Sequence, residues 1–452
     1  MSDIRIVRPT DHAGYFKLWR QLNETFPWRD SIDELLAKIG VEEFDRRCST
    51  FKETCRELFK QDLYALMRFG SSTGDRIHAN VGVRWLDQPF LYKTIRKYDE
   101  LNRAGKLHRK WIYHARGSFK TTTIQQLCVQ KIFQKPDIRI NYYSRTEPMA
   151  RDRAGGIKLE LETNPLFHLL FPEILWGKDP KDAGAEDWSD GSFTVKRGSA
   201  GRAAEAMSES TVKCWGISAV GTGGHPEVNI LDDVVDDTNA HSPPMAKKIA
   251  RQMAATTKAS DPSDAQHRQD WIVGTEYSNR SAYKICQEDG LIRSVWYEGA
   301  VDFSRYGRMD QKTFDEQLEA GAIEGVLLTN AELRDYRGKG TKAWVSFCQQ
   351  YLCRVDLVEK KKLDAARVSF YTSSGQEAAH RANLYALCDP AGFPGLSQEQ
   401  QLCDSAIGIF ALCQDGNVRW LDGRLDKLSA TERMTWLFHA VQRWSRVGNF
   451  IE

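Results

Sequence analysis

Two short segments of the chain contain residue types that handle phosphate chemistry. The segment HARGSFKTT at 114–122 places a lysine beside two threonines, and VNILDDVVDD at 228–237 is an apolar run that ends in paired aspartates. A lysine in a loop before a helix can bind phosphate oxygens, and a neighbouring hydroxyl can ligate Mg²⁺. Carboxylates at the end of a strand can hold the metal and a water. The ordered pair therefore indicates hydrolysis of a nucleoside triphosphate.

The first segment is a degenerate match to the P-loop pattern G-x-x-x-x-G-K-[ST]. Lys120 and Thr121 fit the end of the pattern, but His114 and Phe119 stand where it has glycines, and only Gly117 remains inside the loop. A lysine followed by two threonines is, by itself, more often a solvated turn. The candidate ATP-binding residues are Arg116, Gly117, Ser118, Phe119, Lys120, Thr121 and Thr122.

The second segment supplies the carboxylates. In this interpretation Lys120 reaches the β- and γ-phosphates of ATP, while Thr121 and Asp232 hold Mg²⁺. Asp233 then orients or deprotonates the attacking water. The alternative interpretation is that these aspartates belong to an ordinary acidic loop. That interpretation is less favoured because Lys120 precedes them, in a loop that is predicted to lie between a strand and a helix. The expected cofactors of this site are ATP and Mg²⁺.

A parallel sheet is the element that must position both loops. Apolar runs at 111–115 and 138–144 predict strands, and an amphipathic pattern at 121–133 predicts a helix between them. Further strands are predicted at 211–220, 228–233 and 271–277. The order strand, loop, helix, strand favours an α/β fold with helical crossovers.

The flanking regions have different patterns. Residues 1–80 read as helical, with helices predicted at 31–39 and 51–69, and no phosphate or metal chemistry is visible there. From 384 onward the sequence predicts strands at 384–392, 405–413 and 417–425, with a hairpin turn at Asp415-Gly416. A helix at 429–444 follows, and it opens with a capping box of Ser429 and Glu432.

Composition excludes some classes of protein. The 452 residues carry a formal net charge of +2, so any contact with nucleic acid must come from a local patch. The stretch 93–110 is such a candidate, although a solvated helix face would have the same excess of basic residues. Ten cysteines without a C-x-x-C pair suggest free thiols in a reducing compartment. No apolar stretch approaches the ~18 residues of a membrane span, so we expect a cytosolic protein.

The order R-G-x-x-K-T, then D-D, then G-T resembles the large subunit of tailed-bacteriophage terminases, the ATP-driven DNA-packaging motors. The resemblance covers about 90–452. It implies that Arg116 senses the γ-phosphate, that Asp232 and Asp233 are the magnesium and catalytic carboxylates, and that Thr275 belongs to a motif coupling hydrolysis to movement. Asn229 interrupts the usual apolar run before the carboxylates, which departs from the family's pattern.

The same resemblance implies a C-terminal nuclease domain with a ribonuclease-H-like fold. Such a domain holds two divalent metals, Mg²⁺ or Mn²⁺, with three carboxylates. Asp389 matches the first carboxylate, Asp404 is a candidate accessory ligand, and Glu452 matches the second by context. The third is expected further downstream and is absent from these 452 residues. We therefore expect this nuclease to be incomplete and weak.

The sequence thus predicts a RecA/ASCE-like P-loop ATPase with a parallel sheet, followed by the start of a ribonuclease-H-like domain. The expected regions are 1–80 helical, 81–300 ATPase, 301–380 linker subdomain and 381–452 nuclease. By resemblance the partners are double-stranded DNA, a small terminase subunit and the procapsid portal protein, with a homo-oligomeric ring and no membrane, in the cytoplasm of an infected bacterial host. The alternatives are a helicase-like or DNA-repair P-loop ATPase, and a nucleic-acid scaffold whose ATP site has decayed.

Overall fold

The chain divides into two compact units in a computed structural model, residues 1–360 and residues 361–452. The structure describes residues 12–25, 38–71, 89–103, 110–176, 179–185, 187–197, 209–219, 225–258, 269–278, 280–292, 294–298, 311–323, 328–338, 341–353, 382–389, 405–414, 417–426, 428–444 and 449–450. Each unit contains a β-sheet of its own.

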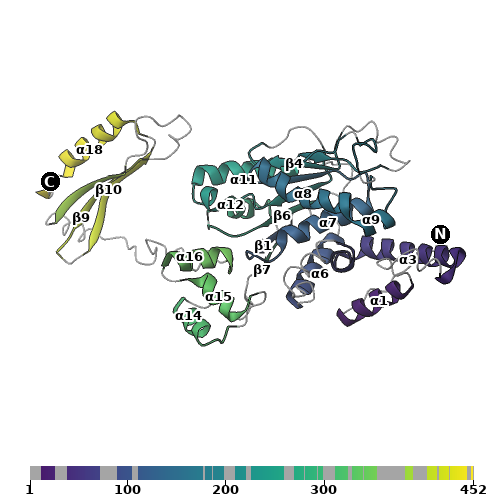
Figure 1. The fold of residues 1–452 in the computed structure, drawn as a ribbon. Helices are drawn as coiled ribbons and strands as arrows, with labels where there is room; N and C mark the ends of the chain where they lie inside the picture. Colours follow the sequence, from purple (N-terminus) through teal and green to yellow (C-terminus); the bar gives the residue numbers. More distant parts are fainter. Residues whose placement is uncertain are drawn as a thin grey trace. The chain divides into compact units, whose positions relative to one another are not determined.

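A seven-stranded sheet forms the centre of the first unit, in the order β3-β4-β2-β5-β6-β1-β7 (Figure 1). The strands are β1 Lys110–His114, β2 Ile140–Ser144, β3 Ser192–Phe193, β4 Val212–Gly216, β5 Val228–Asp232, β6 Gln269–Gly274 and β7 Ser294–Glu298. Every neighbouring pair is parallel except β3 with β4. The prediction of a mostly parallel α/β sheet is confirmed.

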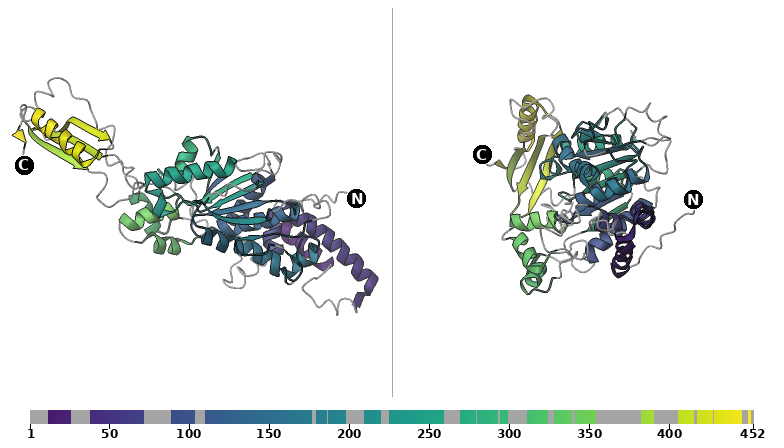
Figure 2. Two further views of the ribbon diagram at one scale, coloured as in Figure 1. Left: turned by 90° about the horizontal axis from the view of Figure 1, so that it is seen from above. Right: turned by 45° about the vertical axis from the view of Figure 1, so that its right-hand side comes forward.

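Helices cover both faces of this sheet (Figures 1 and 2). The helices of this unit up to α12 are α1 His12–Thr25, α3 Val41–Gln61, α4 Leu63–Ala65, a π-helical turn η1 Leu66–Gly70, α6 Pro89–Arg103, α7 Lys120–Gln134, α8 Glu147–Thr163, α9 Pro165–Leu170, α10 Asp237–Ala240, α11 Pro243–Lys258 and α12 Ala282–Glu288. Successive residues of a strand point to opposite faces. Ile230 accordingly joins one core, with Ile124 of α7, whereas Leu231 joins the other, with Met253 of α11.

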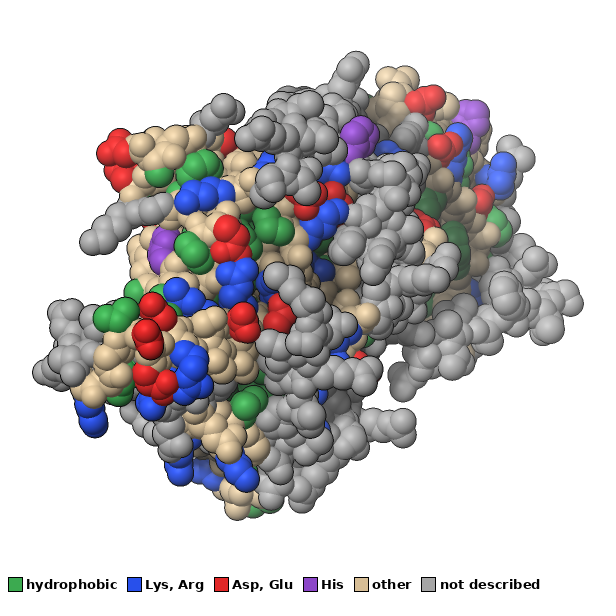
Figure 3. Space-filling view, turned by 90° about the vertical axis from the view of Figure 1, so that its right-hand side faces the viewer, with side chains coloured by type: hydrophobic (Ala, Val, Ile, Leu, Met, Phe, Trp, Pro, Cys, Tyr) green, Lys and Arg blue, Asp and Glu red, His purple; other side chains and the backbone are tan. Residues whose placement is uncertain are grey.

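The N-terminal helices pack on the same core as α7. Tyr15 donates a hydrogen bond to Asp62, which is fully buried and also pairs with Arg96 at 2.9 Å. Arg103 pairs with Asp99 at 3.0 Å, so part of the basic stretch 93–110 is neutralised within the fold. Acidic and basic side chains are interspersed on the face drawn in Figure 3. Most of the helix predicted at 31–39 lies outside the described residues.

Three helices after the sheet form a third core, comprising α14 Gln311–Glu319, α15 Asn330–Arg337 and α16 Thr341–Gln350. Phe314, Trp344 and Phe347 are buried in it. Ala115, from the loop after β1, is fully buried in the same cluster. The loop that carries the candidate lysine therefore shares a core with residues about two hundred positions later in the chain.

The second unit is a four-stranded sheet in the order β10-β9-β8-β11, with one long helix. The elements are β8 Asn383–Asp389, β9 Ser405–Leu412, β10 Val418–Asp426, α18 Ala430–Trp444 and β11 Asn449–Phe450. β9 is antiparallel to both of its neighbours. Ser429 Oγ accepts from the Glu432 amide and the Glu432 carboxylate accepts from the Ser429 amide, so the predicted capping box is confirmed. The predicted turn at 415–416 lies outside the described residues.

The nine cysteines in the described part of the chain are free, and seven of them are buried, as expected. Within the described ranges, no helix has the length and apolarity that crossing a membrane requires.

Lys131 is a buried cation in the interior of α7, and its Nζ donates to Asn102 Oδ1 at 2.6 Å. Burial lowers its pKa to about 8. Between pH 8 and 10.5 the unfolded chain therefore binds more protons at this residue than the folded chain, so stability rises with pH. Relative to Lys131→Met, wild type should gain on the order of 3 kcal/mol across that window. Denaturant unfolding at several pH values measures the difference.

Gln130→Met is the matched control for this prediction. Gln130 is buried on the same helix and its amide donates to Phe59 O at 3.0 Å, but it carries no titratable group. Its stability difference from wild type should stay constant with pH. A difference for Lys131→Met that is equally flat would show that Lys131 does not titrate in this window.

Candidate nucleotide-binding site

The two predicted chemical segments meet at one edge of the sheet. Strands β1, β6 and β5 are parallel neighbours, so their carboxyl ends open on the same edge. Lys120 is the first residue of α7 and Asp232 is the last residue of β5. Lys120 Nζ lies 3.2 Å from Asp233 Oδ2. Two residues that are far apart in the sequence therefore form one charged site.

The loop before α7 keeps a glycine-like backbone despite its missing glycine. Gly117 has φ 80°, and Phe119 has φ 57° and ψ 24°, which is the left-handed region that glycine favours. Ser118 Oγ donates to Ala115 O at 2.6 Å and tightens the turn. No side chain caps the start of α7, and its first turn contains no acidic residue. The positive end of the helix is thus available to an anion.

Asp232 is fully buried and held through one of its oxygens. Tyr142 donates its hydroxyl to Asp232 Oδ2 at 2.8 Å, and Ser144 Oγ donates to the Asp232 carbonyl at 2.9 Å. Burial raises the pKa of Asp232, and the neighbouring Asp233 adds to the rise, while Arg153 and Lys120 oppose it. A divalent cation would supply the additional positive charge that the anionic form needs.

Each aspartate has one oxygen that accepts no hydrogen bond from the described residues. These atoms are Asp232 Oδ1 and Asp233 Oδ1, and both are shielded from solvent by the protein. Mg²⁺ is commonly held by one or two carboxylates together with phosphate oxygens and waters. The pair fits that demand. No group of three or more side chains able to ligate a metal occurs among the described residues.

Arg153 completes the site, although no sequence motif pointed to it. It lies on α8, and its guanidinium contacts Asp233 Oδ2 at 3.2 Å and Asp232 Oδ2 at 3.4 Å. Burial opposes its charge, but the two aspartates outweigh burial and raise its pKa. The only sequence signal was its place on the helix that follows β2, the strand next to β5 in the sheet.

The end of β6 lies next to the end of β5, beside the aspartates. Thr275 directly follows the strand and is buried, and Gly274 is its last residue. The hydroxyl of Tyr283 accepts from the Val235 amide at 3.4 Å, two residues after Asp233. Burial raises the pKa of Tyr283 well above its usual value, with the charge of Asp233 adding to the rise. Tyr283 therefore remains neutral while its hydroxyl holds the backbone of Val235, two residues after Asp233.

Gly274→Ala should destabilise this part of the site. An added Cβ would lie 2.9 Å from Tyr283 Cε2 and Cζ, and closer still to the hydroxyl. Tyr283 is fully buried and cannot swing away, so the overlap should reduce the free energy of unfolding by about 1–3 kcal/mol. Denaturant unfolding measures this loss.

Gly155→Ala on α8 is the matched control, because an added Cβ there meets nothing within 4 Å. It should be as stable as wild type or slightly more stable, since alanine favours the helix. The double variant Gly274→Ala/Tyr283→Phe should recover part of the loss. Equal unfolding midpoints for Gly274→Ala and wild type would contradict the assigned overlap.

Arg116 does not contact the aspartates. Its amide donates to the Gln350 carbonyl at 2.7 Å and its guanidinium donates to Gln350 Oε1 at 2.9 Å. The candidate γ-phosphate sensor is thus bound to the end of α16. Thr121 and Thr122 are half-buried in the first turn of α7. Asn229, which interrupts the apolar run, donates to Asp270 Oδ1 at 2.8 Å inside the core.

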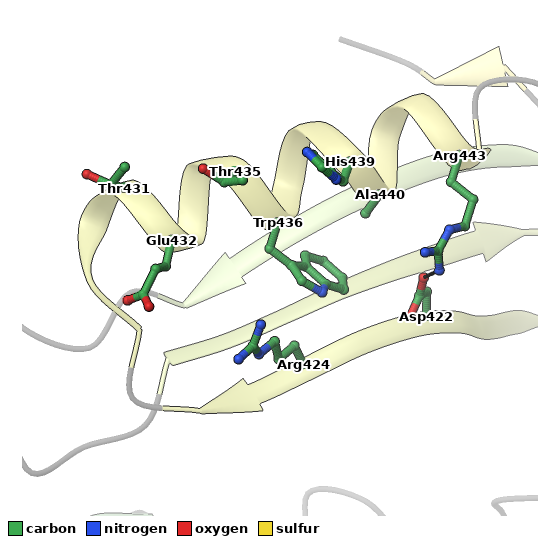
Figure 4. Close-up of a pocket in the computed structure, with 9 residues that line it drawn as sticks. All are labelled: Asp422, Arg424, Thr431, Glu432, Thr435, Trp436, His439, Ala440 and Arg443. Atoms are coloured by element: carbon green, nitrogen blue, oxygen red, sulfur yellow. Dashed lines mark hydrogen bonds and ion pairs between the residues drawn. The ribbon is translucent and has the colours of Figure 1, made fainter.

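The predicted nuclease ligands are only partly described. Asp389 is exposed at the last residue of β8, whereas Asp404 and Glu452 lie outside the described residues. Leu384 is in the core that includes Trp444 of α18, so alternation along the strand places Asp389 on the opposite face of the sheet. On the α18 face, a groove of about 360 Å³ runs beside β10 and α18, where Asp422 pairs with Arg443 (Figure 4).

Comparisons with known proteins find matches among solved structures. Two solved structures are similar to this chain: the large terminase from a thermophilic bacteriophage in complex with ATP-gamma-S, and the same protein in complex with ADP. Both are 11% identical, cover 78% of this chain and 73% or 74% of their own, and give a TM-score of 0.30. No family model and no curated protein matches the chain. At this TM-score function must be argued from the residues.

Proposed function

We propose that this chain is an ATP hydrolase that drives translocation of double-stranded viral DNA into a procapsid. The observation that carries the proposal is the contact of Lys120 with Asp233, at 3.2 Å, on the carboxyl edge of a parallel sheet. Such an edge, with a helix N-terminus beside it, is where nucleotides bind in open α/β sheets. The free oxygens of Asp232 and Asp233 add a place for Mg²⁺.

The residues of the site have separate roles in this proposal. The backbone of residues 117–121 and the Lys120 ammonium bind the phosphates, and Thr121 with Asp232 holds Mg²⁺. The metal, when bound, neutralises charge that develops on the phosphate oxygens. Asp233 accepts the proton of the attacking water or orients it. Lys120 must then exchange its contact with Asp233 for the phosphates, while Arg116 must leave Gln350 to reach the γ-phosphate.

The family resemblance of the motifs supports the biological setting. In that setting the chain acts with a small terminase subunit and the procapsid portal protein, as a homo-oligomeric ring in the infected bacterial host. The second unit, with its three-stranded antiparallel β10-β9-β8 and a following helix, is proposed as part of a metal-dependent endonuclease that uses Asp389. Its chemistry is proposed to use Mg²⁺ or Mn²⁺.

DNA-stimulated ATP hydrolysis tests the proposal. The 452-residue chain should hydrolyse ATP faster when double-stranded DNA is present, and Lys120→Ala should abolish the activity. Equal inactivity of wild type and Lys120→Ala, with DNA and partners present, would favour the scaffold alternative. ATP-dependent strand separation would instead favour the helicase-like alternative.

A further inference from the structure

Arg153 reaches both candidate catalytic carboxylates from a different part of the fold. Its Nη1 donates to the Asp232 carbonyl at 2.6 Å and to Ser144 Oγ at 3.0 Å, and its Nη2 donates to Asp233 Oδ2 at 3.2 Å. Nη1 also lies 3.4 Å from Asp232 Oδ2. The side chain is only 17% exposed. One planar cation thus ties α8 to the end of β5 and to the end of β2.

The contacts of Arg153 fall on one oxygen of each carboxylate. Oδ2 of Asp232 is shared by Tyr142 and Arg153, and Oδ2 of Asp233 is shared by Lys120 and Arg153. The opposite oxygens, both named Oδ1, accept no hydrogen bond from the described residues. Arg153 therefore holds each carboxylate through its Oδ2 atom and leaves the Oδ1 atom, which is buried but accepts no hydrogen bond, as the remaining donor to a ligand.

Arg153 also provides positive charge that balances the two aspartates. Two cations, Lys120 and Arg153, face two adjacent carboxylates. When Lys120 binds phosphate it leaves Asp233, and Arg153 is the contacting cation that stays with both aspartates. A guanidinium presents five donors in a fixed fork, so it can keep several contacts at once, which a lysine ammonium cannot do with the same geometry.

We propose that Arg153 is a positioning residue for ATP hydrolysis, which holds Asp232 and Asp233 through their Oδ2 atoms and so leaves their Oδ1 atoms without a protein hydrogen bond, as potential ligands for the metal and the water. This inference rests on the proposed function. Arg153 contacts the carboxylates and, in this proposal, no phosphate. Its loss should consequently impair the chemical step much more than the binding of nucleotide.

The test compares three variants of the full chain. Arg153→Gln should lower kcat for ATP hydrolysis by about 100-fold, because misplacing a catalytic group by about 1 Å costs that much. KM for ATP, and Kd for a fluorescent ATP analogue measured by titration, should stay within about threefold of wild type. Arg153→Lys keeps the charge but loses the fork, so it should recover only about a tenth of the kcat.

Arg151→Gln is the matched control. Arg151 lies on the same helix, is exposed, and pairs with Glu147 instead of the aspartates. It should change kcat by less than about twofold. If Arg153→Gln does not fold, as judged by thermal melting, Arg153→Lys decides: wild-type kcat in that variant would overturn the inference. A tenfold or larger rise in Kd for the analogue, equal to the fall in kcat/KM, would also overturn it.

The outcomes distinguish failure of the role of Arg153 from failure of the proposed ATPase function on which it rests. A wild-type chain without ATPase activity overturns both. An active wild type, with Arg153→Gln equally active, overturns only the role of Arg153 and leaves the proposed ATPase intact.

Discussion

Asp233→Asn should reduce ATP hydrolysis by about 100-fold or more, the largest effect we expect from a single atom change in this chain. Asparagine has the same shape, but its amide cannot accept a proton from water at neutral pH. It also removes the negative charge that Lys120 and Arg153 contact at 3.2 Å. Steady-state ATPase assays with saturating DNA and Mg²⁺ measure the loss.

Binding should survive this substitution better than catalysis. A fluorescent ATP analogue should bind to Asp233→Asn with a Kd within about tenfold of wild type, since the backbone proposed to bind the phosphates is unchanged. Asp237→Asn is the control, because Asp237 lies in the first turn of α10, is exposed, and pairs with His241 on the protein surface. It should retain full activity. Equal rates of ATP hydrolysis for Asp233→Asn and wild type would show that Asp233 takes no part in the reaction.

Lys120→Ala should weaken nucleotide binding as well as abolish hydrolysis. The side chain is 12% exposed at the start of α7, where a cation and the helix N-terminus would act on the same bound anion. Charge-assisted hydrogen bonds to phosphate are among the strong ones, so Kd for the fluorescent ATP analogue should rise by more than about tenfold. The measurement is a fluorescence titration of the full chain in the presence of Mg²⁺.

Lys158→Ala is the matched control for this second substitution. Lys158 lies on α8 and pairs with the exposed Asp190 at 3.1 Å, away from the aspartates of β5. Its Kd for the analogue should equal that of wild type. Unchanged binding in Lys120→Ala would mean that nucleotide, if it binds, does so elsewhere on the protein.

The elements that carry Lys120 and Asp232 could be predicted from sequence because their signals are local. A short, mostly apolar segment is typical of a parallel strand that is buried on both faces, and β5 is buried at all five of its positions. The loop was harder to recognise. Phe119 has a left-handed backbone conformation, which a glycine at this position would have suggested, so the sequence pattern alone did not predict it.

The supporting residues could not be predicted, because only the tertiary fold brings them to the site. Tyr142 and Arg153 belong to β2 and α8, and nothing in their own sequence windows sets them apart from other tyrosines and arginines. For Arg116, the local sequence predicted a contact that the structure does not show. Its local motif implied a contact with phosphate, whereas its side chain is bound to Gln350, 234 positions away.

The burial of Ala115 among Phe314, Trp344 and Phe347 determines how the protein can be divided for experiments. Gln349 also donates to the carbonyl of Tyr277, just beyond Thr275. A fragment that stops near residue 300 would expose Ala115 to water and remove the hydrogen-bond partner of Arg116. The smallest fragment suited to biochemical study of the nucleotide site therefore extends through Cys353, so that β1 and α16 are expressed together.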